Sequence, residues 1–413
     1  MADRNVCAGL KVVGNFPATK KYGSPWPTGK QQNGRRKMVS KQEVVEKVLQ
    51  LGFADVGFTS AASFESQLRI LEERKEEYDW FLKVGFDMFE GTDPGNALAG
   101  ARSIIVVIDA FFRESFPPVM EAHFGRTYLD DDRKTLDRGA VRIAALRKFL
   151  LEHGVNSSIP INMPQRLSAA RAGLGSFGKN SLFFANKGAL GGSWTNPIAL
   201  VVDAEFAPDQ SSIGFGCPEW CRDACVAACP TRALQGGGRI DPRRCISQLT
   251  QRDEGITPIG LREEMGLWVY GCDRCQDVCP RNAPILASKR PPNEKVAAME
   301  KDFQLTRLLQ MDEEYFSTRI WPHMFYTPVQ KMWRWKMNAA RAMGNSRDSR
   351  YLPELCHAFG ENSDARVCGM IAWAIGRLGG EEARRALDEF LPGSSGAIRE
   401  EIQLALVGLN PKT

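Results

Sequence analysis

The sequence predicts a mixed α/β domain, followed by a cysteine-rich module and an all-helical repeat domain. Apolar strand-like runs alternate with helical patterns between about residues 40 and 205. Eight of the eleven cysteines then fall between residues 217 and 279, and the patterns after them are helical and repeat. We therefore expect four segments, namely 1–38, 39–205, 206–290 and 291–413.

Composition and length indicate a globular protein. A chain of 413 residues is long enough for two or three domains with cores of their own. No apolar run approaches the roughly 20 residues that cross a bilayer, and no secretion signal opens the chain. Arg35-Arg36 is followed by Lys37 and then a charged helix, which does not fit a twin-arginine signal. We therefore expect a cytoplasmic protein without a membrane partner, in a compartment where structural disulfides are uncommon.

The positive charge is concentrated at the N-terminus. Residues 1–37 hold eight Lys/Arg and one acid, Asp3. The net charge of this segment is therefore +7 and that of the remaining residues is −2, which gives +5 for the whole chain. The segment is rich in Gly, Pro, Asn and Gln and has no helical period. It predicts either a disordered basic extension or an arm that contacts nucleic acid or a partner.

Order is expected to begin near Val39. Ser40 and Glu43 have the spacing of a capping box, and Val39 and Val44 can form a hydrophobic staple around it. The later patterns predict helices over 65–83 and 140–153 and buried strands over 103–108 and 198–202.

The C-terminal helices repeat with a constant period. Gly344, Gly376 and Gly408 each end an apolar helix and lie 32 residues apart. This period predicts helical hairpins of the HEAT type, with a plain helical bundle as the alternative.

The cysteine pattern predicts two iron–sulfur clusters. Soft thiolate sulfur is the ligand that iron cubanes require, and two runs that end in Cys-Pro are typical of two-cluster ferredoxins. In such proteins the last cysteine of each run binds the other cluster. The first [4Fe–4S] cluster is therefore assigned to Cys217, Cys221, Cys225 and Cys279. The second cluster is assigned to Cys229, Cys245, Cys272 and Cys275.

The first run departs from the usual spacing. Cys217, Cys221 and Cys225 are separated by three residues where ferredoxins have two, so we expect a wider loop. A three-cysteine cluster with an open iron site, a zinc site and disulfides are the alternatives. Cys356 and Cys368 lie in the helical repeats and are expected to be buried small hydrophobes.

A basic tract in the helical region predicts a nucleic-acid surface. Trp333 and Trp335 alternate with basic residues that could hold phosphate while the rings stack on unpaired bases. The candidate contacts are Lys331, Arg334, Lys336 and Arg341. The alternative is a helix with a solvated basic face and buried tryptophans.

Several motifs, in order, resemble those of the epoxyqueuosine reductase family, which is related to the reductive dehalogenases. The resemblance runs from about Val39 to the C-terminus. It rests on Asp93-Pro94 with residues 98–105 (LAGARSII), 169–182 (AARAGLGSFGKNSL), 244–247 (RCIS), 270–280 (YGCDRCQDVCP) and 338–345 (NAARAMGN).

The resemblance implies a cofactor that the residue types alone do not indicate. It implies a nitroreductase-like α/β core that holds base-off cobalamin, supplied with electrons through the two clusters. Its distinctive motif suggests cofactor contacts at Arg171, Gly173, Gly175, Gly178, Lys179, Asn180 and Ser181. The glycines would let backbone approach the corrin, and a tight turn before a helix is their alternative role. The chain lacks Asp-x-His-x-x-Gly, the motif in which His ligates cobalt in many B12 proteins. This absence is compatible with the family, and equally with a protein that binds no cobalamin.

The sequence departs from the family where a proton donor is expected. The family's Asp-Tyr-His motif is replaced by residues 128–132, Tyr-Leu-Asp-Asp-Asp, and no acid precedes the Ala-Ala-Arg motif. Because a reductase acting on a polar ring needs an acid, Tyr128, Asp131 and Asp132 are the catalytic candidates, with Asp130 beside them. The three aspartates could equally form a solvated loop.

Three functions remain open at this point. The first is a cobalamin- and iron–sulfur-dependent reductase acting on epoxyqueuosine in tRNA, with a ferredoxin or flavodoxin as electron donor. The second is a dehalogenase-like enzyme acting on a small molecule. The third is a non-catalytic electron-transfer protein that activates a corrinoid partner.

Overall fold

The computed structural model describes residues 39–83, 86–129, 138–187, 192–252, 255–324 and 327–409. The basic extension 1–38 and the candidates Asp131 and Asp132 lie outside the described residues. No helix in these ranges is both long and apolar enough to cross a membrane.

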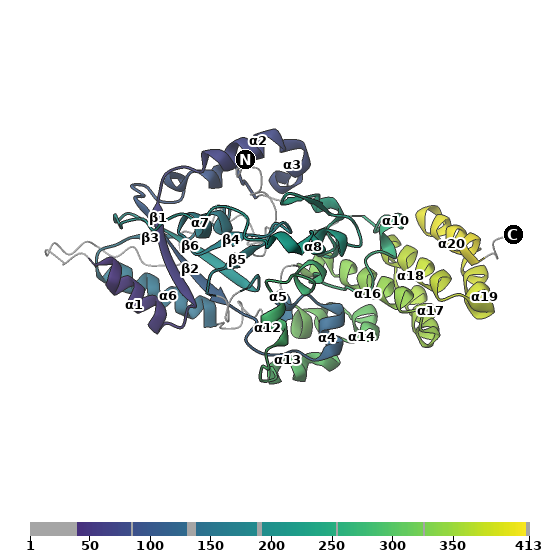
Figure 1. Cartoon of the computed structure of the whole chain (residues 1–413). Helices are drawn as coiled ribbons and strands as arrows, with labels where there is room; N and C mark the ends of the chain where they lie inside the picture. Colours follow the sequence, from purple (N-terminus) through teal and green to yellow (C-terminus); the bar gives the residue numbers. More distant parts are fainter. Residues whose placement is uncertain are drawn as a thin grey trace.

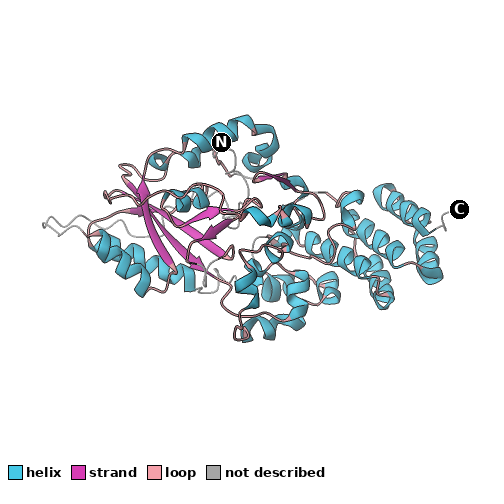
Figure 2. Ribbon diagram, viewed as in Figure 1, coloured by secondary structure: helices cyan, strands magenta, loops and turns pink. Residues whose placement is uncertain are grey.

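A four-stranded sheet forms the centre of the N-terminal half (Figures 1 and 2). Its order is β1 (Asp55–Ser60), β2 (Ser103–Ala110), β6 (Thr195–Val202) and β3 (Ser157–Ser158), and all neighbours are antiparallel. Both predicted strands are confirmed as its central pair. They are apolar on both faces because helices cover both.

Helices α1 (Lys41–Gln50) and α6 (Arg138–Glu152) cover one face of the sheet, and α7 (Gln165–Arg171) covers the other (Figure 1). Successive side chains of β2 alternate between the two cores: Ile105 packs with the α1 and α6 residues, and Ile104 packs with those of α7. The Ser40–Glu43 capping box of α1 is confirmed. The expected helix over 65–83 divides into α2 (Glu65–Glu73) and α3 (Lys75–Lys83).

The cysteine-rich segment consists of short elements. These are α8 (Ala224–Ala227), β7 (Leu234–Gly236), β8 (Arg239–Ile240), α9 (Ile246–Arg252), α10 (Ile259–Arg262), α11 (Arg274–Asp277) and α12 (Ala283–Ala287). The hairpin β4 (Gly175–Phe177) and β5 (Phe183–Ala185) lies between the sheet and this segment (Figure 1). The helices α4 (Pro118–His123) and α5 (Arg126–Leu129) precede the hairpin in the chain. α5 contacts the cysteine-rich segment through the backbone amide of Arg126, which donates to Asp273.

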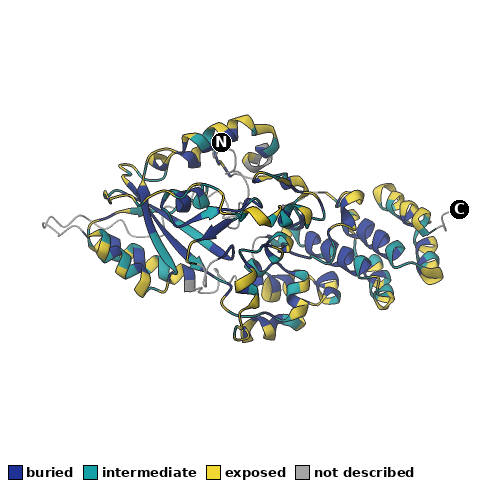
Figure 3. Cartoon of the chain, viewed as in Figure 1, coloured by how far each residue is buried: buried dark blue, intermediate teal, exposed yellow. Residues whose placement is uncertain are grey.

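The C-terminal part is helical, as expected. It comprises α13 (Glu294–Met299), α14 (Leu305–Gln310), α15 (Glu313–Tyr315), α16 (Trp333–Ser346), α17 (Leu352–Glu361), α18 (Ala365–Leu378), α19 (Gly380–Phe390) and α20 (Gly396–Leu409). Figure 3 shows α16 and α18 largely buried, whereas α19 and α20 carry more exposed surface.

The periodic glycines lie where the helices of this stack touch. A Cβ at Gly344 of α16 would collide with Ala374 of α18, and one at Gly376 would collide with Ala405 of α20. Gly408, on the last helix, has open space instead. The 32-residue period therefore reflects close helix contacts that need a residue without a side chain.

Candidate active site and cluster-binding module

A cavity of about 160 Å³ lies where α5, α7, α9 and α11 meet the β4–β5 turn. Four cysteines from three separate segments line it: Cys229, Cys245, Cys272 and Cys275. Its polar lining includes Tyr128, Arg166, Asn180, Ser247 and Gln251.

The four cysteines of this cavity lie close enough to influence one another. Burial raises the pKa of the Cys272 thiol well above its ordinary value, and the negative charges of Cys245 and Cys229 raise it further. Burial likewise raises the pKa of Cys275, with Cys272 and Cys245 contributing. Such thiols ionise when iron binds them, because a coordinating metal displaces the proton.

A second group of cysteines gathers nearby. Burial raises the pKa of Cys225 to about 11, and the charges of Cys279, Cys217 and Cys221 add to the rise. Cys279 is 54 positions beyond Cys225 in the chain, yet it lies with the first run. The fold thus brings the last cysteine of each run to the other group, which is the grouping expected from the sequence.

The module's sulfurs also receive backbone hydrogen bonds. The amide of Lys179 donates to Cys217 Sγ at 3.3 Å, and the amide of Ala233 donates to Cys229 Sγ at 3.3 Å. Within the described ranges, no three His, Cys, Asp or Glu side chains converge as ligands of a single metal ion do. A cubane instead spreads its four thiolates over four iron corners.

The backbone accommodates the unusual spacing of the first run of cysteines in a turn after Cys221. Arg222 and Asp223 follow Cys221 with φ of 46° and 59°, so two consecutive non-glycine residues adopt the left-handed conformation. The Nζ of Lys179 pairs with the carboxylate of Asp223 at 2.5 Å and ties this turn to the β4–β5 hairpin. The extra residues therefore form a widened turn around the first group of cysteines.

The predicted cofactor glycines are packed against protein. Cβ atoms at Gly173, Gly175 and Gly178 would collide with the Gln210 carbonyl, the Phe184 carbonyl and the Asn180 side chain, respectively. These close contacts with protein account for the glycines without a corrin, although a β-hairpin and not the expected helix forms there. Their role in cobalamin binding remains a prediction.

The other residues of that motif hold the hairpin in place. Asn180 Nδ2 donates to the Cys275 carbonyl at 3.3 Å, and the hydroxyl of Ser181 donates to the Gly238 carbonyl. Arg171 instead donates to the Ala62 carbonyl at 3.0 Å, 4.4 Å above the Phe64 ring. The motif therefore attaches the hairpin to the cysteine-rich module.

Tyr128 is brought to the cavity, as a catalytic candidate should be. Its hydroxyl lies 3.2 Å from Ser247 Oγ, and its ring meets the Tyr270 ring edge-on at 5.1 Å. Burial raises the pKa of Tyr128, so the phenol keeps its proton at neutral pH. A phenol that keeps its proton can act as a general acid.

Arg166 is a site residue that the sequence did not identify. It lines the cavity near Tyr128 and Cys275, and burial lowers its pKa to about 10, which still leaves it charged at neutral pH. Its position one helical turn before the Ala-Ala-Arg motif was the available signal, but a lone arginine there is equally compatible with a surface role.

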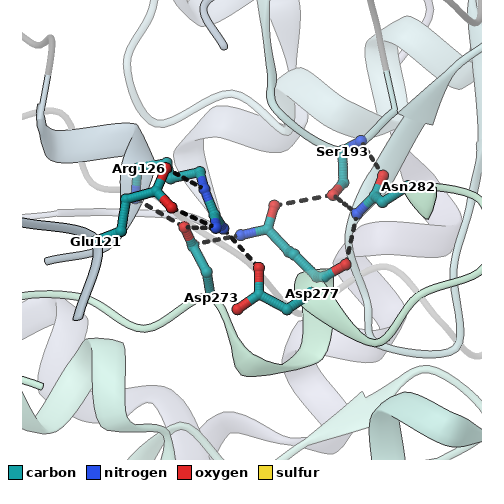
Figure 4. Close-up of polar contacts among 7 residues, drawn as sticks. Glu121, Arg126, Ser193, Asp273, Asp277 and Asn282 are labelled. Atoms are coloured by element: carbon teal, nitrogen blue, oxygen red, sulfur yellow. Dashed lines mark hydrogen bonds and ion pairs between the residues drawn. The ribbon is translucent and has the colours of Figure 1, made fainter. Parts of the chain in front are cut away.

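A polar network fixes the segment between Cys272 and Cys275 (Figure 4). Arg126 faces three carboxylates, those of Glu121 at 3.1 Å, Asp273 at 3.3 Å and Asp277 at 2.5 Å. Burial, which lowers the pKa of Arg126, is outweighed by these carboxylates, which raise it above the ordinary value. The network joins α5, which carries Tyr128, to α11, which carries Cys275.

The predicted nucleic-acid surface is wrong for its two arginines. Arg334 and Arg341 are 2% and 0% exposed. Their guanidinium groups donate to carbonyls of Gln251 and of Gly266 and Trp268. The accepting carbonyls lie in the last turn of α9 and in the loop after α10, so the arginines are turned inward and cannot touch RNA.

Lys331 and Lys336 are half-buried, and Lys336 donates to Asn362 Oδ1 at 3.3 Å. The alternative reading of this tract is half right: Trp333 and Trp335 are buried, but the arginines are buried with them.

Comparison with known proteins agrees with this geometry. Residues 217–282 match the family model described as a 4Fe-4S double cluster binding domain. The chain is 31% identical to an epoxyqueuosine reductase of Lactococcus garvieae, over 82% of this chain and 96% of that protein. It is 28% identical to one of Bacillus anthracis, over 84% and 92%, respectively.

Solved structures show the same fold. A selenomethionine-labelled epoxyqueuosine reductase superposes with a TM-score of 0.74 at 25% identity, covering 90% of this chain and 99% of that chain. A second one, bound to an epoxyqueuosine-modified tRNA stem loop, has a TM-score of 0.74 at 26% identity and covers 89% and 98%.

Proposed function

Since this chain belongs to the epoxyqueuosine reductase family of oxidoreductases, we propose that it reduces epoxyqueuosine in tRNA with electrons carried by two [4Fe–4S] clusters. The observation that carries the proposal is the convergence of eight cysteines into two crossed groups, one of which opens into the cavity with Tyr128. The first cluster would be held by Cys217, Cys221, Cys225 and Cys279. The second would be held by Cys229, Cys245, Cys272 and Cys275.

Electrons are proposed to enter at the first cluster. Cys217 and Cys221 keep part of their surface exposed, and Trp220 beside them is 71% exposed. The second group lies deeper, around a cavity that also contains Tyr128. This order suits a low-potential carrier such as a ferredoxin or flavodoxin as donor, with the second cluster serving the substrate side.

Cobalamin is proposed as the group that passes electrons to the substrate, and the family resemblance supports it. When bound, it would supply a strong nucleophile or one-electron donor that side chains cannot imitate. The cavity of about 160 Å³ is smaller than the roughly 300–1,000 Å³ of small-molecule pockets, and its four cysteines assign it to the second cluster. The glycines of the expected cradle also contact protein. The cavity and these glycines therefore do not by themselves identify a corrin site, and the proposal rests on the family resemblance.

The proton donor is proposed to be Tyr128, with Asp131 and Asp132 as further acids. Tyr128 is supported by its place in the cavity and its retained proton. The aspartates are supported by a relative: a structure of the Bacillus subtilis enzyme is described with an aspartate catalytic loop swung out of the active site.

Substitution of Tyr128 by Phe tests the donor. We expect turnover to fall by about 100-fold or more, because general acids typically contribute this much. Iron content and cluster reduction should stay unchanged, since the phenol ring remains in place. Normal turnover of Tyr128→Phe would exclude this residue as the proton donor.

Beyond family membership, a division of the chain into three structural domains is proposed. We propose that the segment 39–205 is a nitroreductase-like core, that 206–290 is the cluster module and that 291–413 is a HEAT-like array. The array is supported by the paired helices α17–α18 and α19–α20 and by the glycine contacts of the α16, α18 and α20 stack.

The function is tested with protein purified without oxygen. Iron and sulfide are measured, spectra are recorded with and without added cobalamin, and tRNA carrying epoxyqueuosine is offered together with a reduced ferredoxin. Conversion to queuosine supports the proposal. Cluster-loaded protein that binds cobalamin but leaves this tRNA unchanged would contradict the substrate, and protein that binds no cobalamin would contradict the cofactor.

A further inference from the structure

Asp273 is a buried carboxylate between two proposed ligands of the second cluster. Its side chain is 2% exposed, and it lies one residue after Cys272 and two before Cys275. Asp273 lines the same cavity as both thiols. A buried charge at this range acts strongly, because little water screens it.

Hydrogen bonds hold this carboxylate in its ionised form. Its Oδ2 accepts from the Arg126 backbone amide at 2.7 Å and from Arg126 Nη1 at 3.3 Å. Its Oδ1 accepts from Gln276 Nε2 at 2.7 Å. Donors aimed at a carboxylate favour its charged state, so Asp273 is a fixed negative charge.

The rest of the network keeps that charge in place and does not cancel it. Arg126 is shared among Asp273, Asp277 and Glu121, so one positive charge faces three negative ones (Figure 4). Its guanidinium lies 5.3 Å from the Trp194 ring, which covers it on one side. Figure 4 also shows Ser193 and Asn282 on the far side of the same network from Arg126, and the Ser193 hydroxyl donates to Gln276 Oε1 at 2.9 Å.

An opposite charge faces the same cavity. Arg166 lines this cavity together with Cys275. The second group of cysteines therefore shares its cavity with a buried carboxylate just before α11 and an arginine on α7.

We propose that Asp273, positioned by Arg126, lowers the reduction potential of the second cluster, and that Arg166 raises it. Reduction adds one electron from the donor to the cluster and breaks no bond, so the cluster gains one negative charge. A neighbouring carboxylate disfavours that gain, and a neighbouring cation favours it. The inference rests on the proposed function only in requiring the two clusters.

The test measures the potential of each cluster by redox titration followed by electron paramagnetic resonance, with dithionite and mediators, on the whole protein without tRNA or cobalamin. We expect Asp273→Asn to shift the second cluster to a higher potential and to leave the first unchanged. Arg166→Gln should shift the second cluster in the opposite direction.

Asp277→Asn is the matched control, because it removes the same charge from the same arginine. Its carboxylate is 33% exposed, so solvent screens it and the shift should be smaller. Equal shifts in the two aspartate variants, or no shift in Asp273→Asn, would overturn the proposal. So would a shift of Arg166→Gln to higher potential, which remains measurable if Asp273→Asn fails to fold.

The outcome is separable from that of the proposed function. A wild-type chain with two titrating clusters that leaves epoxyqueuosine unchanged would refute the substrate and leave this inference intact. A wild-type chain without a second cluster would refute both.

Discussion

Individual side chains decide which surfaces of this protein take part in chemistry. Cys245 illustrates this. It precedes Cys272 by 27 positions in the sequence, yet both line the same cavity. Cys368 is more deeply buried than Cys245, but its thiol donates to the Asn362 carbonyl inside the helical stack. Burial alone therefore does not identify a ligand, whereas convergence with other thiols does.

Replacing Cys245 by Ser is expected to remove the second cluster and leave the first. Anaerobic protein should then contain about four irons in place of about eight, because each cubane holds four. Iron and sulfide analysis measures this, with Cys368→Ser as the control that keeps the full content. Full iron content in Cys245→Ser would show that this thiol is not a ligand.

At the scale of an element, α16 holds the backbone that leads to the second cluster. Four side chains on one face of the helix, spaced by four, three and four residues, donate to carbonyls between residues 250 and 269: Arg334, Asn338, Arg341 and Asn345. Three of the accepting carbonyls lie in the last turns of α9 and α10, where a helix leaves its carbonyls without partners inside the helix. The motif at 338–345 is therefore explained by a contact between two parts of the fold.

Asn338→Ala tests this helix. Asn338 Nδ2 donates to the Thr250 and Val269 carbonyls, each at 3.0 Å, and its removal leaves both buried acceptors without this donor. We expect a loss of about 2–3 kcal/mol in the free energy of unfolding, measured by urea denaturation.

Asn96→Ala is the matched control, because Asn96 is exposed and its side-chain amide donates to the Glu90 carbonyl at 3.1 Å. Its cost should stay below about 1 kcal/mol. If the two variants lost the same stability, α16 would not support the segment in the manner described.

At the scale of the whole molecule, the last helix is tied back to the cluster module. Arg262 of α10 makes a two-pronged ion pair with Glu401 of α20, at 2.7 and 2.6 Å. The arginine is 2% exposed and also donates to the Thr257 carbonyl at 2.7 Å. This contact joins positions 139 residues apart, so the helical stack and the module support each other.

Glu401→Gln should weaken that tie. It leaves the Arg262 charge buried without its carboxylate, which costs about 3–5 kcal/mol in comparable pairs. Hydrogen exchange should speed up in α20 and in α10. The neighbouring Glu400 is exposed, so Glu400→Gln should exchange like wild type. Unchanged exchange in Glu401→Gln would mean that the stack holds without this pair.

The sequence predicted the local features well because short-range patterns carry them. The capping box at Ser40, the strand pair at 103–108 and 198–202, and the helical C-terminus follow from periodicity and capping chemistry, and the structure confirms them. Family membership followed from ordered motifs, and the relatives confirm it. The break at Arg74 inside the expected helix was missed because no Pro or Gly marks it.

Long-range contacts decided the rest. The same motif residues that suggested a corrin cradle are engaged by Gln210, Phe184 and the cysteine-rich module, since close packing fills the space beside each glycine. The sequence alone suggested that Arg334 and Arg341 form a basic surface. In the folded chain their guanidinium groups donate to backbone carbonyls of Gln251 and Gly266. Spacing and residue type therefore revealed which atoms can bind iron. Only the folded chain, through burial and unmatched backbone groups, determined which charges face the clusters and which are used to hold the protein together.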